Sequence, residues 1–104
     1  MGRKEIHELL DIALDIIEKG RGENGYPYVY MSVSNYGTEL RIEIMDDGFR
    51  PGHPYDGIYE FDIRGEISER RYNACKEHLY ELREKVKGVD DVCMDTSAHA
   101  AETI

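Results

Sequence analysis

Apolar residues recur at helical spacing near the start of the chain. Between Arg3 and Lys19 they form a broad stripe, and acidic residues occupy the opposite side. This pattern predicts an amphipathic helix that ends at Gly20, a residue suited to a left-handed C-cap. The predicted stripe consists of Ile6, Leu9, Leu10, Ile12, Ala13, Leu14, Ile16 and Ile17.

Three segments with alternating apolar and polar residues follow, and each predicts a β-strand. They span residues 26–33, 38–45 and 58–63. Residues 34–37, Ser-Asn-Tyr-Gly, suit a tight hairpin turn between the first two strands. Residues 46–57 contain three glycines and two prolines, which predicts a long irregular loop. One face of the sheet would then collect Val29, Met31, Val33, Leu40, Ile42, Ile44, Tyr59, Phe61 and Ile63.

A second amphipathic helix is predicted from Ser68, a suitable N-cap, to Lys87, with Gly88 just beyond its end. Its apolar stripe consists of Ala74, Cys75, Leu79, Leu82 and Val86.

The order of these elements predicts an α+β fold. It is a two-layer α-β-β-β-α arrangement, a three-stranded antiparallel sheet with two helices packed on one face. Residues 1–87 form this single domain. Residues 88–104 carry four acids and no Lys or Arg, and we expect an acidic tail that is disordered or loosely docked.

Composition narrows the class of protein. The chain has 104 residues, enough for one hydrophobic core, and a formal net charge of −9. It contains neither an apolar stretch of membrane-spanning length nor a signal-peptide core, so we expect no membrane association. Two cysteines are too few for a disulfide-framed scaffold, which favours a reducing, cytoplasmic location. The acidic balance argues against direct nucleic-acid binding and favours a larger protein partner with a basic surface.

The sheet face opposite the aliphatic one is the candidate binding surface. It would display tyrosines beside carboxylates, and the long loop would add aromatic side chains. Tyrosine is enriched at protein interfaces, and carboxylates steer a basic partner, although the same residues also suit an ordinary solvated sheet face. The candidate partner-binding residues are Tyr26, Tyr28, Tyr30, Glu39, Glu43, Glu60 and Asp62 on the strands, with Phe49 and Tyr55 on the loop.

These observations favour a non-enzymatic interaction module that blocks the basic, nucleic-acid-binding surface of a partner. One concrete form is a phage-type inhibitor of a host nuclease or defence protein, with carboxylates standing where phosphates bind. A homodimer is also compatible with the sequence.

Residues capable of catalysis or metal binding lack a recognisable pattern. Cys75, His78, Cys93 and His99 could complete a tetrahedral zinc site if the tail folded back, but a buried free cysteine and a boundary histidine explain the first pair more simply. The loop residues Asp46, Asp47, His53 and Asp56 lack the ligand spacing of a calcium site, and we interpret the loop as a contact element. No nucleophile or phosphate-binding motif occurs, so we expect no enzymatic activity and no cofactor.

The order helix, three strands, helix also resembles the double-stranded-RNA-binding domain over about residues 5–87. Glu69-Arg70-Arg71 and Lys76 fall near the position where that family places a basic helix start. The resemblance implies an alternative function, an RNA-binding domain that uses the second helix through Arg70, Arg71 and Lys76.

Overall fold

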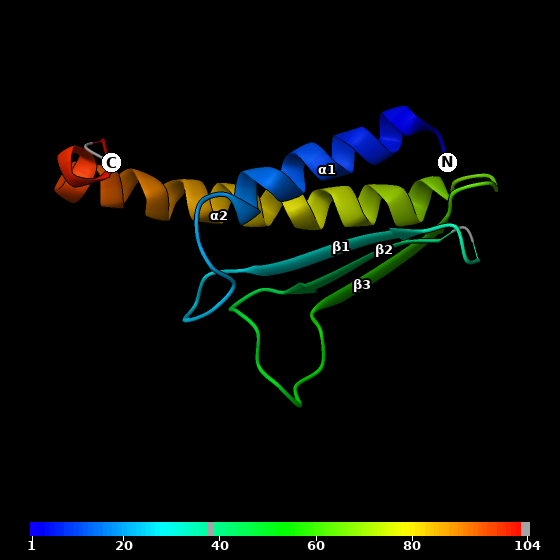
Figure 1. Cartoon of the computed structure of the whole chain (residues 1–104), viewed down its shortest axis with the longest axis horizontal. Coiled ribbons are helices and arrows are strands. Elements are labelled where there is room, and N and C mark those ends of the chain that lie inside the picture. The colour runs from blue at the N-terminus through cyan, green and yellow to red at the C-terminus, as the bar shows by residue number, and fades with distance from the viewer. Residues whose placement is uncertain (38, 103–104) are drawn as a thin grey trace.

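The structure, a computed structural model, describes the backbone of residues 1–37 and 39–102, and the side chains of these residues as far as Lys87. The element order is α1 (Arg3–Ile17), β1 (Tyr28–Ser34), β2 (Glu39–Met45), β3 (Gly57–Asp62) and α2 (Glu69–Glu102). The three strands form an antiparallel sheet in the order β1-β2-β3. Both helices lie on one face of this sheet (Figure 1), which confirms the predicted α+β fold.

The core lies between the helices and the central strand. Leu40, Ile42 and Ile44 of β2 are fully buried, with no exposed side-chain surface. α1 packs on β1 and α2 packs on β3, so each helix covers one edge strand and both meet above β2. Successive strand residues point to opposite faces, so the register that buries these three aliphatic residues turns Glu39, Arg41 and Glu43 outward.

The apolar stripe of α2 differs from the prediction at one position, and the helix is longer than predicted. Ala74 is exposed, whereas Tyr72, which the stripe did not include, is buried. The helix continues beyond the predicted end at Lys87 to Glu102. The structure describes no side chains from Gly88 onward, so the prediction that the tail is disordered or loosely docked falls outside the described residues.

The stripe of α1 is only partly buried. Leu9, Ile12, Ala13 and Ile16 face the core. Leu10, Leu14 and Ile17 remain 36%, 36% and 43% exposed. A sheet of three strands beneath two helices offers each helix a contact surface narrower than the predicted stripe. The helix ends at Ile17 with Glu18 as its C-cap, slightly earlier than the predicted end at Gly20.

Tyr26 does not lie on the open sheet face, where the sequence analysis placed it. β1 begins two residues later, at Tyr28, after the buried Pro27. The Tyr26 hydroxyl donates a hydrogen bond of 2.9 Å to the carbonyl oxygen of Ile16, and its ring packs against the hydrophobic core. Tyr26 thus joins the end of α1 to the sheet, and the prediction that it lies on the open sheet face is wrong.

Neither helix, within the described part of the chain, combines the length and the apolar character needed to cross a membrane.

Candidate functional site

The open sheet face, the side of the sheet that no helix covers, carries most of the predicted binding residues. The strand register places Tyr30 opposite Glu43, Arg41 opposite Glu60, and Glu39 opposite Asp62. The last pair brings two carboxylates together at one end of the sheet. Tyr30 is 46% exposed and Ile58 of β3 is 48% exposed, so this face exposes both charged and apolar side chains.

Arg41 is the basic residue at the centre of the open face, and two carboxylates hold it. Its Nε donates to Glu43 at 2.6 Å, and its Nη1 donates to Glu60. The hydrogen bond with Glu43, supported by that with Glu60, raises the pKa of Arg41. The open face carries four carboxylates, those of Glu39, Glu43, Glu60 and Asp62. Arg41 offsets only one of these charges, so the net charge of the face is negative.

Aromatic side chains of the loop between β2 and β3 join the open face. The rings of Phe49 and Tyr28 lie 5.1 Å apart, centroid to centroid, at an angle of 55°. A hydrogen bond to Glu43 raises the pKa of Tyr55, and partial burial raises that of Tyr28. Met45, on the same side of the sheet, is only 4% exposed. The predicted loop residues therefore lie next to the predicted strand residues.

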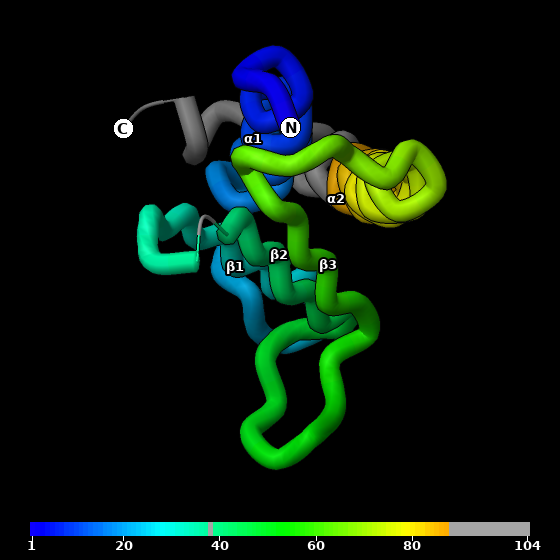
Figure 2. The backbone as a smooth tube through the Cα atoms, turned by 90° about the vertical axis from the view of Figure 1, so that its right-hand side faces the viewer, coloured from blue at the N-terminus to red at the C-terminus, as the bar shows by residue number. Residues whose placement is uncertain are grey.

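The base of this loop is fixed by backbone hydrogen bonds to the connection between α1 and β1. Gly25 donates to the carbonyl oxygen of Asp47 at 3.0 Å, and Phe49 donates to that of Gly22 at 2.8 Å. Gly48 has φ +104°, and a Cβ there would lie 2.9 Å from the Cα of Glu23. Both the backbone conformation and the close approach therefore require glycine at this position. Beyond the base, the loop projects away from the helices (Figure 2).

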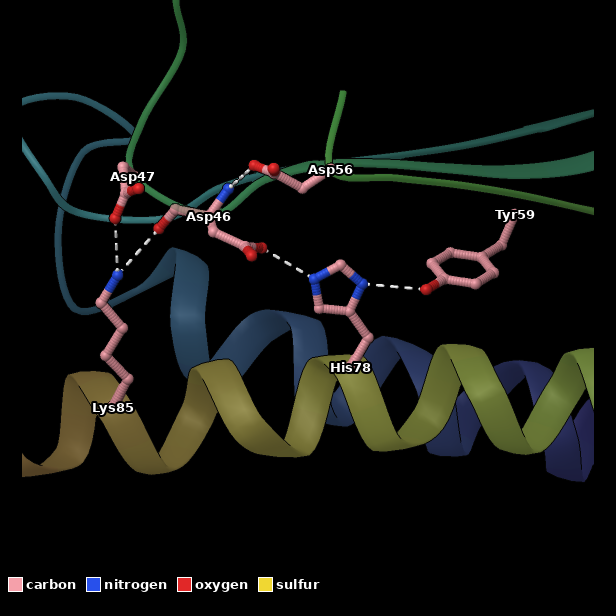
Figure 3. Close-up of polar contacts among 6 residues, drawn as sticks. All are labelled: Asp46, Asp47, Asp56, Tyr59, His78 and Lys85. Atoms are coloured by element: carbon pink, nitrogen blue, oxygen red, sulfur yellow. Dashed lines mark hydrogen bonds and ion pairs between the residues drawn. The ribbon is translucent and has the colours of Figure 1, made fainter. Parts of the chain in front are cut away.

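A chain of hydrogen bonds runs from β3 through α2 to the loop (Figure 3). The hydroxyl oxygen of Tyr59 lies 2.9 Å from His78 Nδ1, and His78 Nε2 lies 2.7 Å from Asp46 Oδ1. Lys85, two turns along α2, donates to the carbonyl oxygen of Asp46 at 3.0 Å and to Asp47 Oδ1 at 3.1 Å. A Cβ at Gly57 would lie 2.8 Å from His78 Nδ1, so glycine leaves room for the imidazole.

The geometry assigns a direction to this chain of hydrogen bonds. The Asp46 carboxylate can only accept, so Nε2–H donates to it, and in the neutral imidazole Nδ1 then accepts the hydroxyl proton of Tyr59. Burial raises the pKa of Tyr59, so its phenol stays protonated at neutral pH and is not an activated nucleophile. Cys75 is fully buried, and desolvation raises the pKa of its thiol to about 12. His78 and Lys85 therefore position the loop against α2, and neither Tyr59 nor Cys75 is an activated nucleophile.

The zinc hypothesis is tested only in part. Cys75 lies in the core and His78 is bonded to Tyr59 and Asp46. The side chains of Cys93 and His99 lie outside the described residues. Among the side chains that the structure does describe, no three His, Cys, Asp or Glu residues lie close enough together to hold a metal ion.

The basic residues at the start of α2 make contacts within the domain. Arg71 Nη1 donates to the carbonyl oxygen of Glu60 at 3.2 Å. Lys76 lies 3.5 Å from Glu8 and 5.1 Å above the ring of Tyr72. The ion pair with Glu8 offsets the charge of Lys76, whereas the bond of Arg71 to a neutral carbonyl oxygen orients its guanidinium without reducing its charge.

The sequence analysis missed the link between His78 and Asp46, which are 32 residues apart. The position of His78, one turn after the buried Cys75, indicated only a residue at the boundary of the core. No local pattern pairs it with Asp46.

Comparison with protein-family models, with curated proteins and with solved structures finds no match. The class of protein is therefore defined by the fold and the surface of this chain alone. It is a small α+β domain with both helices on one side of a three-stranded sheet and an acidic, aromatic face on the other.

Proposed function

We propose that this chain is a non-enzymatic interaction module whose open sheet face binds a basic surface of a larger protein. The proposal is carried by one observation: the sheet face that the helices leave uncovered combines carboxylates with aromatic rings. Glu39, Glu43, Glu60 and Asp62 lie on two neighbouring strands, with Arg41 between them. Tyr28, Tyr30, Phe49 and Tyr55 border these acids along β1 and the loop.

The two kinds of side chain would serve different parts of binding. Carboxylates attract a positively charged partner over several ångströms and accelerate its association, an effect that salt weakens. Exposed aromatic rings supply most of the contact free energy once the surfaces meet. The existing contacts of Arg41 with Glu43 and Glu60, and of Phe49 with Tyr28, hold several of these groups in place before a partner arrives. Less conformational entropy is then lost on binding.

The most specific form of the proposal is an inhibitor that occupies the nucleic-acid-binding surface of a nuclease or defence protein, as a phage-type protein does. Carboxylates on the open face would take the positions of phosphates, and the partner's Lys and Arg side chains would bind them. The protein would then compete with nucleic acid for one surface.

An NMR titration with a Lys- and Arg-rich peptide tests where basic partners bind. We expect the amide shifts to concentrate on the open face, around Tyr30 and Glu60, and to decrease steeply as salt is raised. The exposed Asp11 of α1 and Glu18 at its C-cap provide an internal control because they carry charge on the helix, on the other side of the sheet from the open face. Equal shifts on α1 and on the open face would mean that net charge alone binds the peptide, and would refute the proposal.

Matched variants separate local chemistry from total charge. Glu60→Gln and Asp11→Asn each remove one negative charge, the first from the open face and the second from α1. We expect Glu60→Gln, and more strongly Tyr30→Ala, to weaken peptide binding, while Asp11→Asn leaves it nearly unchanged. Equal losses in the two charge variants would contradict a specific surface.

The alternative function, duplex RNA binding by α2, makes the opposite prediction in the same assay. Duplex RNA would shift the amides around Arg70, and charge reversal at Arg70 and Arg71 would abolish binding. The ion pair of Lys76 with Glu8 and the contact of Arg71 with β3 give this alternative less support.

A further inference from the structure

The two edges of the sheet are protected very differently. β3 carries Glu60 and Asp62, and Arg71 of α2 donates a hydrogen bond to the Glu60 carbonyl oxygen. β1, with the sequence Tyr-Val-Tyr-Met-Ser-Val-Ser, contains no charged residue and no proline. Charges, prolines and covering groups are the usual means by which proteins prevent edge strands from pairing with other chains. Gly22 packs against Tyr28 at the start of β1, and the rest of this strand is therefore the edge that is open to a further strand.

The flank of α1 on the same side of the molecule is apolar. Leu10, Leu14 and Ile17 are spaced by four and three residues, so they form one row along the helix. α2 contacts α1 through the opposite flank, where Arg83 donates to Asp15 at 3.1 Å and Tyr72 donates to Glu8. In the view along the strands (Figure 2), α2 lies toward β3 and away from β1. The apolar row therefore lies above the β1 edge.

We propose that the β1 edge and the row Leu10, Leu14 and Ile17 form an interface between two copies of this chain. The two β1 strands would pair antiparallel around Met31, so that Tyr30 of one copy faces Ser32 of the other and Val29 faces Val33. This register pairs residues of the same sheet face in both copies. The result is a continuous six-stranded sheet with all four helices on one side.

Three observations favour a second copy as the occupant of this surface. Two chains that each carry a charge of −9 repel each other least where they meet through an uncharged surface, and this strand and helix row together contain no charged side chain. Antiparallel pairing of a strand with itself satisfies a two-fold axis, so the assembly closes at two copies. Val33 is 61% exposed, the most exposed of the aliphatic strand residues described, and the paired strand and the apposed α1 would cover it.

Light scattering coupled to gel filtration tests the proposal over a series of protein concentrations. The wild-type chain should approach twice its mass of 12.0 kDa as concentration rises. Val33→Lys places a charge on the β1 edge, and Leu14→Glu places one on the α1 flank. Both residues are exposed in the single chain, so circular dichroism should show an unchanged fold, and both variants should stay monomeric.

Ile58→Lys is the matched control. Ile58 is a β-branched strand residue that is 48% exposed, but it lies on β3 and on the open face. This variant should dimerise like the wild type. A wild-type chain that is monomeric at every concentration overturns the proposal, and so does dimerisation of either Val33→Lys or Leu14→Glu. Because the assay contains no binding partner, its outcome is independent of the proposed function of the open face.

Discussion

Replacing His78 by alanine should destabilise the domain and release the loop between β2 and β3. The change removes two hydrogen bonds, one to the partly buried Tyr59 and one to Asp46, and leaves a gap where the imidazole was. The side chain of His78 is 14% exposed and that of Asp46 is 39% exposed, so solvent weakens the second bond. A net hydrogen bond contributes about 1 kcal/mol, and with the lost packing we expect a decrease of about 2–3 kcal/mol in unfolding free energy.

Urea denaturation measures the global effect, and hydrogen exchange measures the local one. His78→Ala should shift the urea midpoint to lower concentration, and the amides of residues 46–56 should exchange faster. His78→Asn should fall between the alanine variant and the wild type, because the Asn side-chain oxygen can accept from Tyr59 at the position of Nδ1 but cannot reach Asp46. The loop amides should nevertheless exchange as fast in this variant as in the alanine variant.

Glu77→Ala is the control, because Glu77 adjoins His78 on α2 and its side chain is exposed. Its unfolding free energy should stay within about 0.5 kcal/mol of the wild type. The reasoning fails if His78→Ala stays within that same margin, or if the loop exchanges at the wild-type rate in both His78 variants.

Three further predictions concern other contacts. Burial raises the pKa of the Cys75 thiol from 9.0 to about 12, so between these pH values the folded chain keeps a proton that the unfolded chain loses. The contribution of this thiol to the unfolding free energy should be constant below pH 9 and should decrease by about 1.4 kcal/mol per pH unit between pH 9 and 12. Urea unfolding of Cys75→Ala should show a pH dependence weaker than that of the wild type by this slope. Tyr72→Phe removes the hydrogen bond to Glu8 and should lower the unfolding free energy by about 1 kcal/mol. Tyr36→Phe, at a residue that is 91% exposed, should leave the unfolding free energy unchanged. Equal effects of the two variants would contradict a stabilising role of the hydrogen bond between Tyr72 and Glu8. Arg41→Gln removes the cation at the centre of the open face and should strengthen binding of a Lys-rich peptide with a steeper salt dependence; weaker binding would argue against an electrostatic role for this face.

The sheet was predictable because its signal has a period of two and one side must be buried. Once Leu40, Ile42 and Ile44 point to the core, Glu39, Arg41 and Glu43 must point outward, and the register of the neighbouring strands follows. The open face was therefore predicted almost residue by residue. Tyr26 was the exception, because alternation alone does not show that β1 begins only after Pro27.

The helices were less predictable, because a helical stripe shows which residues are apolar but not how wide a surface the sheet offers. Leu10 and Leu14 fit the pattern of α1, yet three strands leave them at the flank. On α2, Tyr72 extends the buried row of Cys75, Leu79, Leu82 and Val86 at spacings of three and four residues and packs edge-on against Phe61, whereas Ala74 lies off this row. The link from His78 to Asp46 depends on how the helix lies over the sheet, which no local pattern encodes.

The loop between β2 and β3 combines a fixed base with a projecting tip. Its two ends are joined where the amide of Asp46 donates to Asp56 Oδ2 at 2.7 Å and that of Asp56 donates to the carbonyl oxygen of Ile44 at 2.8 Å. The tip, residues 50–54, is exposed throughout. Sequence changes there should leave both the core and the base intact. This tip is accordingly where a fluorophore, an epitope or a few inserted residues can be introduced to follow the protein without altering its fold.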